Sequence, residues 1–205
     1  MTINIIKDFV IAFAMLITPF YVAWLSYNQY SKNKKTDFEL ELLKTKESDS
    51  HLKFTENVTN VYGELWQLLA ETDATRVYII QPHPIHSAVF VSVLYEVCHR
   101  GVSGMKGVVL NVEIINAIKF VNMLEANNLF VSNDLDKDLD SDYMKSVFNS
   151  MGTESMVIKK LINHNKNWAG SIVVEYKKSK QITDEVIRTI GYTANTIQYI
   201  LPDYV

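Results

Sequence analysis

Two histidines and the adjacent pair Cys98-His99 are of the residue types that bind metal ions or act as nucleophiles. His83 and His86 stand three apart in the string PHPIH, and Cys98-His99 follows one predicted strand later. The two prolines make 82–86 extended, and neighbouring residues of a strand point to opposite faces of the sheet. A zinc site needs several converging ligands, and no carboxylate stands near this string. We therefore expect no metal site and no cofactor.

A run of alternating aspartates, NDLDKDLDSD, is similar in composition to a calcium-binding loop. An EF-hand loop beginning at Asp134 would need glycine where Leu139 stands and glutamate where Lys145 stands. A loop beginning at Asp136 fails in the same way, with Ser141 and Val147 at those two positions. Like charges spaced by two residues repel one another and extend the segment. The run predicts a solvated acidic loop that offers an exposed contact surface.

Several function classes are disfavoured by what the sequence lacks. It contains no nucleotide-binding glycine loop, no G-x-S-x-G and no H-E-x-x-H, so we do not expect an enzyme. The formal net charge of −3 gives no global basic field, which argues against a dedicated nucleic-acid binder. The single cysteine, Cys98, excludes an internal disulfide.

The N-terminal region contains an apolar run without charged residues from Phe9 to Ser31. At about 1.5 Å per residue this run is long enough for a hydrocarbon core of roughly 30 Å, so we predict a tail at 1–8 and one transmembrane helix at 9–30. The alternative is a signal peptide, but no small-x-small cleavage site follows the run. The residues expected to contact the lipid bilayer are Phe9, Phe13, Leu16, Pro19, Tyr21, Trp24 and Tyr27.

The charges on either side of this helix leave its orientation open. Lys7 precedes the helix, whereas Lys32, Lys34 and Lys35 follow it. The positive-inside rule then favours a cytoplasmic C-terminal domain, although the excess of lysines is small.

A helical connector is predicted at 31–72, because apolar residues recur there at helical spacing and form one stripe. The polar string KTKESDS at 44–50 predicts a break between two helices. The stripe packs either on the following domain or on a sister helix of a second copy.

An α+β domain is predicted at 73–205. Its antiparallel sheet is flanked by helices, and Thr183 caps the last of them. Lysines gather near the final hairpin, which is typical of a solvated edge that resists strand pairing. The expected strands are 76–81, 88–98, 155–163 and 169–176, and the expected helices are 111–128 and 184–201.

The order of elements at the end of the chain resembles the C-terminal half of a GAF-type domain. In that family a strand, a tight turn, a second strand beginning with a small residue, a polar gap ending in Thr-Asp-Glu and a long closing helix follow one another. The corresponding segments are 155–163, 164–168, 169–176, 177–185 and 186–201. The strings RVYIIQPHP and SVLYEVCHRGVS resemble the first two strands of membrane-linked GAF-like proteins, so the resemblance covers 75–205.

The chain also resembles holins of the T-even phage type. These pair a short tail, one transmembrane helix and a helical connector with an extracytoplasmic α/β domain. The similar residues are Val77-Tyr78, Pro82, Phe90-Val91, Tyr95-Glu96, Ala169-Gly170-Ser171-Ile172 and Ile182-Thr183-Asp184. The resemblance implies a homo-oligomer that permeabilises the host inner membrane and times lysis, with a terminal domain bound by a protein regulator such as an antiholin.

Two other functions remain open. The first is a membrane-anchored GAF-type sensor or scaffold, whose ligand would lie between the sheet and its helices, lined by His86, Tyr95 and Phe120. The alternative for these three residues is ordinary core packing. The second is a structural membrane protein whose domain only binds another protein.

Overall fold

The computed structural model describes residues 2–84, 89–163 and 165–201. Two compact units divide the chain, one comprising residues 1–53 and the other residues 54–205.

Helix α1, Thr2–Thr72, is the first element of the chain. It continues through 44–50, so the predicted break at KTKESDS is wrong. Lysine and glutamate are good helix formers, and residues 36–62 contain neither proline nor glycine, so a polar composition alone does not end a helix. The last turns of α1 carry the predicted apolar stripe, which packs on the domain with Val61, Leu65, Leu68 and Leu69 buried.

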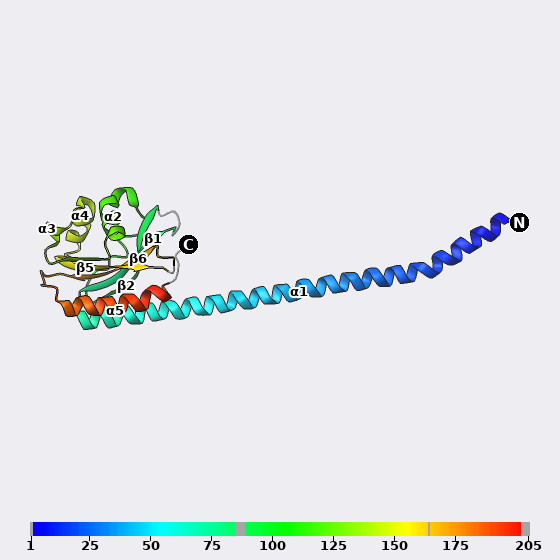
Figure 1. Ribbon diagram of the computed structural model, residues 1–205, viewed down its shortest axis with the longest axis horizontal. Helices are drawn as coiled ribbons and strands as arrows, with labels where there is room; N and C mark the ends of the chain where they lie inside the picture. The colour runs from blue at the N-terminus through cyan, green and yellow to red at the C-terminus, as the bar shows by residue number, and fades with distance from the viewer. Residues whose placement is uncertain (1, 85–88, 164, 202–205) are drawn as a thin grey trace. The chain divides into compact units, whose positions relative to one another are not determined.

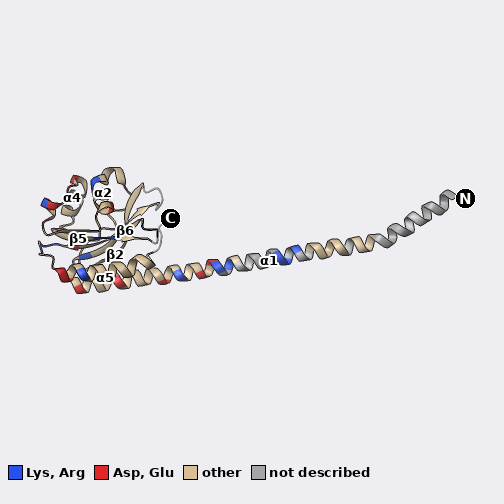
Figure 2. Ribbon diagram, viewed as in Figure 1, with Lys and Arg blue, Asp and Glu red and all other residues tan. Residues whose placement is uncertain are grey.

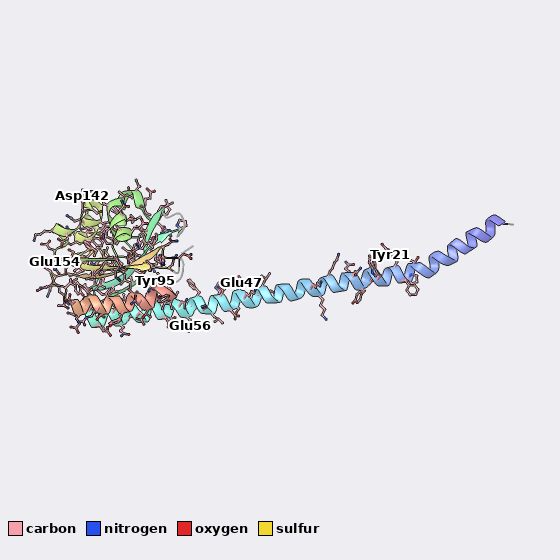
Figure 3. All side chains as sticks on the ribbon, in the orientation of Figure 1. Tyr21, Glu47, Glu56, Tyr95, Asp142 and Glu154 are labelled. Atoms are coloured by element: carbon pink, nitrogen blue, oxygen red, sulfur yellow. The ribbon has the colours of Figure 1, made fainter. Side chains whose placement is uncertain are left out.

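The predicted membrane segment is only partly described. The side chains of Phe9, Phe13 and Leu16 lie outside the described residues. Pro19 lies inside α1. Tyr21, labelled in Figure 3, stacks on Trp24 with ring centroids 6.1 Å apart. The side chains of Tyr21, Trp24 and Tyr27 are exposed. Lysines at 32, 34 and 35 follow these aromatic residues on α1 (Figure 2). Within the described residues, no helix combines the length and the apolar character needed to cross a membrane.

A six-stranded sheet forms the centre of the domain, in the order β3-β2-β1-β6-β5-β4, and every neighbouring pair is antiparallel. Helices cover both faces (Figure 1), which confirms the predicted α+β fold class. The strands are β1 (Arg76–His83), β2 (Phe90–Cys98), β3 (Val112–Glu113), β4 (Leu129–Ser132), β5 (Ser155–Ile162) and β6 (Trp168–Tyr176).

Two hydrophobic cores lie on opposite faces of this sheet. The first core lies beneath α2 (Ile118–Ala126), α3 (Leu135–Asp138) and α4 (Asp142–Ser150), and the Phe120 and Phe148 rings meet edge to face in it. The second core lies beneath the end of α1 and α5 (Asp184–Ile200), with Leu65, Ile172 and Ile197 fully buried. Both faces of the sheet are thus closed by packed side chains.

The predicted helix at 111–128 begins later than expected. Val112 and Glu113 pair with β2 as β3, and a 3₁₀ turn, η1 (Ile114–Ala117), leads into α2. The run of isoleucines fits either a strand or a helix, and pairing with the sheet decides in favour of a strand at its start.

The acidic run is more ordered than a solvated loop. It contains α3 and the start of α4, and Leu135 and Leu139 are buried in the first core between the aspartates. Asp140 pairs with Lys119 across the surface at 2.8 Å.

The closing helix agrees with prediction at its N-terminus. Thr183 is the N-cap of α5, and its side-chain oxygen accepts from the Val186 N–H. Asp184 and Glu185 stand in the first turn, where the helix dipole favours carboxylates.

Candidate functional site

Two of the three residues expected to line one pocket, Tyr95 and Phe120, lie on opposite faces of the sheet. His86 lies outside the described residues. Tyr95 lies in the second core, where its ring meets that of Tyr62 edge to face at 5.7 Å (Figure 3). Phe120 lies in the first core, on the other face of the sheet. Tyr95 and Phe120 therefore cannot line the same pocket.

A β-bulge in β2 explains why the sequence placed Tyr95 on the wrong face. Ile79 pairs with Tyr95, but Ile80 pairs with Val93, so Leu94 is the extra residue. Strict alternation would put Val93 and Tyr95 on one face, whereas the bulge sends Val93 into the first core and Tyr95 into the second. The sequence carries no clear signal for this bulge.

His83 and Cys98, which were considered for a metal site, lie at opposite ends of the β1–β2 ladder. His83 pairs with Phe90 at one end of the β1–β2 ladder, and Cys98 pairs with Arg76 at the other. The His83 Nε2 lies 2.8 Å from the Ser92 Oγ, and burial lowers the pKa of His83. Among the described residues, no group of three or more His, Cys, Asp or Glu could hold a metal ion.

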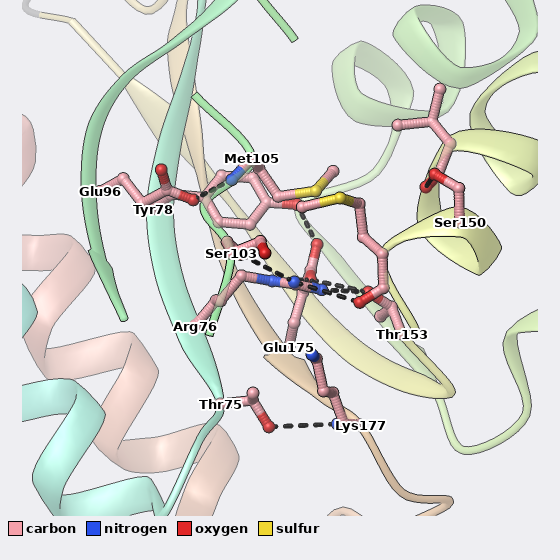
Figure 4. Close-up of polar contacts among 12 residues, drawn as sticks. Thr75, Arg76, Tyr78, Glu96, Ser103, Met105, Ser150, Thr153, Glu175 and Lys177 are labelled. Atoms are coloured by element: carbon pink, nitrogen blue, oxygen red, sulfur yellow. Dashed lines mark hydrogen bonds and ion pairs between the residues drawn. The ribbon is translucent and has the colours of Figure 1, made fainter. Parts of the chain in front are cut away.

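A fully buried polar network joins β1 to β6 (Figure 4). The Arg76 Nε donates to the Glu175 Oε2 at 2.8 Å, and the Tyr78 hydroxyl donates to the other carboxylate oxygen. Arg76 also donates to the Ser103 carbonyl and to the Thr153 Oγ1. Burial, followed by repulsion from Glu175, raises the pKa of Tyr78 well above its ordinary value. Because the side chains of Arg76, Tyr78 and Glu175 are fully buried, the network fixes loops to the sheet and offers no accessible polar group to a ligand.

The single cysteine is not an activated nucleophile. Burial, followed by the nearby Glu96 carboxylate, raises the pKa of the Cys98 thiol to about 12. The thiolate is the reactive form, so Cys98 is protonated and inert near neutral pH.

An open cleft of about 510 Å³ lies between α2 and the turn that joins β5 to β6. We call it the α2 cleft. Ile114 of η1 and Pro82 of β1 add apolar surface to it. One face of α2 lines it with residues at i, i+3, i+4 and i+7, namely Ile118, Val121, Asn122 and Glu125.

The opposite wall of the α2 cleft is the β5–β6 turn. Asn163 holds the turn closed, because its side-chain oxygen accepts from the backbone N–H groups of Asn165 and Asn167, each at 3.0 Å. Lys166 has a φ of 61° there. Trp168 begins β6, and its indole N–H donates to the Ser171 Oγ at 3.1 Å, which fixes the ring beside the cleft.

Lys160 connects the two walls of the α2 cleft. It lies on β5, and its ammonium donates to the carbonyl oxygen of Glu125 in the last turn of α2. A cation is favourable at this position, because the helix dipole places partial negative charge at the C-terminus. The position of α2 over the sheet is thereby linked to a lysine that lines the cleft.

The composition of the α2 cleft suits binding. Polar groups, among them amides and two ammonium groups, form most of its surface, and apolar side chains with one indole form the rest. The described lining residues include no Ser, Thr, Cys or His. The volume of the cleft matches the usual size of a small-molecule site. Neither Trp168 nor Lys160 is predictable as a site residue from the sequence, because the string HNKNW indicates only a turn and Lys160 belongs to a lysine-rich hairpin typical of a solvated edge.

No family model and no curated protein matches the sequence. Solved structures do match the fold. The GAF domain of PixJ from Thermosynechococcus elongatus, in its blue-light absorbing form, is 10% identical with a TM-score of 0.59, over 71% of this chain and 84% of that one. The red/green cyanobacteriochrome NpR6012g4 in its green light-absorbing state is 11% identical with a TM-score of 0.59, over 71% and 94%. The domain has a GAF-type fold.

A further match is the domain of a putative two-component sensor histidine kinase from Sinorhizobium meliloti, 12% identical with a TM-score of 0.52, over 66% of this chain and 84% of that one. These identities establish a common fold only. The matches confirm the predicted GAF-like domain and give no support to the similarity to holins.

Proposed function

We propose that the chain is a membrane-anchored sensor whose GAF-type domain binds a small organic molecule in the α2 cleft. The observation that carries the proposal is the cleft itself, in which Ile118 and Val121 of α2 lie opposite the Trp168 indole. In this proposal the domain binds its ligand without chemical conversion, and the described lining residues include no Ser, Thr, Cys or His.

The walls of the α2 cleft suggest how binding would be signalled. A ligand between α2 and the β5–β6 turn would touch Ile118 on one side and Trp168 on the other. It would also approach Lys160, whose ammonium holds the end of α2. Binding would therefore change the position or the stability of α2, the element of this face best placed to respond.

The GAF-type neighbours support a sensing role by their names. They include light-absorbing cyanobacteriochromes and a domain of a sensor kinase. The first core of this chain is filled by its own side chains, including Phe120, Phe148 and Met156. A ligand of this domain would therefore occupy the open α2 cleft and not the centre of that core.

The membrane anchor is proposed from the sequence. The run from Phe9 to Ser31 carries no charge, and the exposed rings of Tyr21, Trp24 and Tyr27 stand near its C-terminal end. Such rings favour the headgroup layer. Retention of the full chain in membranes after alkaline carbonate extraction is expected, and its release into the supernatant would contradict the anchor.

We also propose that the protein forms a homo-oligomer. Trp66 on α1 and Tyr192 and Tyr199 on α5 are large side chains that stay more than half exposed. Chemical crosslinking of the full chain in membranes should yield dimers or larger species. A lytic role has no supporting observation, and expression without loss of membrane potential is the expected result.

The proposed ligand can be sought by thermal unfolding of the full chain in detergent with a panel of metabolites that carry no phosphate group. A compound at about 100 times its Kd should stabilise the domain by roughly 2.7 kcal/mol, because it binds only the folded state. Trp168→Leu and Ile118→Glu should abolish the shift. Trp66→Leu, a substitution of an exposed residue on α1, should preserve it. A shift that survives both cleft substitutions would contradict the assignment to the α2 cleft.

A further inference from the structure

A second pocket lies where α1 ends and β1 begins, at the end of the sheet opposite to the α2 cleft. Its volume is about 380 Å³, and we call it the junction pocket. Asp73 and Thr75 line it from the α1–β1 turn, and His99 lines it from the end of β2. The loop after β6 contributes Lys177, Lys178 and Lys180. Positive charge therefore exceeds negative charge in this lining.

The main chain of the loop after β6 is fixed in place. The Lys177 N–H donates to the Thr75 Oγ1 at 3.1 Å (Figure 4), and the Ser179 N–H donates to a Glu154 carboxylate oxygen at 2.7 Å. The Ser155 hydroxyl donates to the Lys178 carbonyl at 2.9 Å. The loop therefore presents its lysines from a preorganised backbone, which lowers the entropic cost of binding.

Within the described part of the chain, none of these three lysines forms an ion pair with a carboxylate. The ion pairs Arg76–Glu175, Lys119–Asp140 and Lys137–Asp134 lie outside the junction pocket. Three ammonium groups on one short loop repel one another unless an anion lies between them.

Lys180 has a defined position in the junction pocket. Its ammonium donates to the Thr72 carbonyl at 3.0 Å and lies 4.5 Å from the centre of the Tyr176 ring. Thr72 is the last residue of α1, so this lysine caps the C-terminus of that helix. An anion in the pocket would compete with the Thr72 carbonyl for Lys180.

We propose that the junction pocket binds a small molecule carrying a phosphate group, held by Lys177, Lys178 and Lys180. A phosphate offers several strong acceptor oxygens to the ammonium groups of a lysine-rich loop, and lysine binds phosphate as a point charge. The pocket is larger than one phosphate needs, so the body of the ligand fits beside it, where Asp73 can accept a hydrogen bond from a hydroxyl. Binding would act on the last turn of α1.

The test is titration of the full chain in detergent with inorganic phosphate and pyrophosphate, followed by calorimetry and thermal unfolding. Pyrophosphate should bind, raise the Tm and lose affinity as salt is added. The double variant Lys177→Gln/Lys178→Gln should bind at least about tenfold more weakly. The matched control Lys106→Gln/Arg188→Gln removes the same charge from exposed positions outside the pocket and should bind as the unmodified chain does.

A second experiment distinguishes a lipid headgroup from a soluble phosphate compound as the source of the phosphate. Vesicles of phosphatidylcholine with and without phosphatidic acid test a lipid headgroup, with the same double variant as reference. If the double variant loses binding to phosphatidic acid vesicles and neither protein binds pyrophosphate in solution, the ligand is a lipid headgroup. If the unmodified chain binds pyrophosphate in solution and the double variant does not, the ligand is a soluble phosphate compound. Equal binding by the double variant and the control, or no binding in either arm, would overturn the proposal. The α2 cleft and its ligand are unaffected by either result.

Discussion

Arg76 of β1 and Glu175 of β6 form an ion pair with both side chains fully buried, and the Arg76 Nε donates to the Glu175 Oε2 at 2.8 Å. The pair lies at the start of β1, next to the loops that contain Ser103 and Thr153. It joins the two central strands of the sheet to the loops that cover one end of the first core.

Removing one partner of this pair should strongly destabilise the domain. Glu175→Gln leaves the Arg76 guanidinium buried without a carboxylate, and we expect a loss of about 3–5 kcal/mol in the free energy of unfolding. Denaturant unfolding of the full chain measures this loss. Asp140→Asn makes the equivalent change in the exposed pair with Lys119 and should have far less effect. Equal effects of the two substitutions would contradict a structural role of the buried network.

The Cys98 thiol should react slowly while the chain is folded. Since burial and Glu96 raise its pKa to about 12, alkylation by iodoacetamide near pH 8 should be much slower in buffer than in denaturant. Rapid alkylation of the native chain would show that the thiol is not held in its protonated form.

The same shift makes stability depend on alkaline pH. The pKa of Cys98 is raised in the folded state, so its contribution is fully present below about pH 9 and is lost as the pH rises towards 12. Cys98→Ala removes this contribution, and its free energy of unfolding should fall less steeply over that range. Parallel curves for the two proteins would contradict the prediction.

Gly170 is required where β6 passes close to β1. A Cβ at this position would lie 2.7 Å from the Ile80 carbonyl oxygen, a backbone atom that cannot turn aside, so Gly170→Ala should cost about 2 kcal/mol of stability. Gly63→Ala is the matched control, because a Cβ there meets open space on α1 and should stabilise the helix slightly. Circular dichroism during thermal unfolding compares the two variants.

The sequence predicts the main elements of the domain because their signals are local. The strands at 76–81 and 155–163 are short runs rich in apolar and β-branched residues, which is a local signal for a strand. Thr183 is the N-cap of α5, and Asp184 and Glu185 follow it in the first turn, as expected. The predicted helix break at 44–50 is wrong, because a run of polar residues without proline or glycine does not end a helix. The start of the helix at 111–128 was wrong because β3 forms by pairing with β2, a contact distant along the chain.

The candidate site depended on features that no local pattern encodes. The bulge at Leu94 reverses the facing of Tyr95, which removes it from the face that carries Phe120. Trp168 and Lys160 reach the α2 cleft only through the packing of α2 over the β5–β6 hairpin. Likewise, the lysines near the end of the sheet suggested a solvated edge, and only the folded loop gathers three of them around the junction pocket.

The central claim is that the α2 cleft is a ligand site, and the fluorescence of Trp168 tests it most directly. In a Trp24→Phe/Trp66→Phe variant of the full chain, Trp168 is the only indole that remains of the three. Any metabolite without a phosphate group that raises the Tm of the chain should change the emission of this indole with the same Kd that calorimetry gives. Such a metabolite that stabilises the chain and leaves the Trp168 emission unchanged at saturation would contradict the claim.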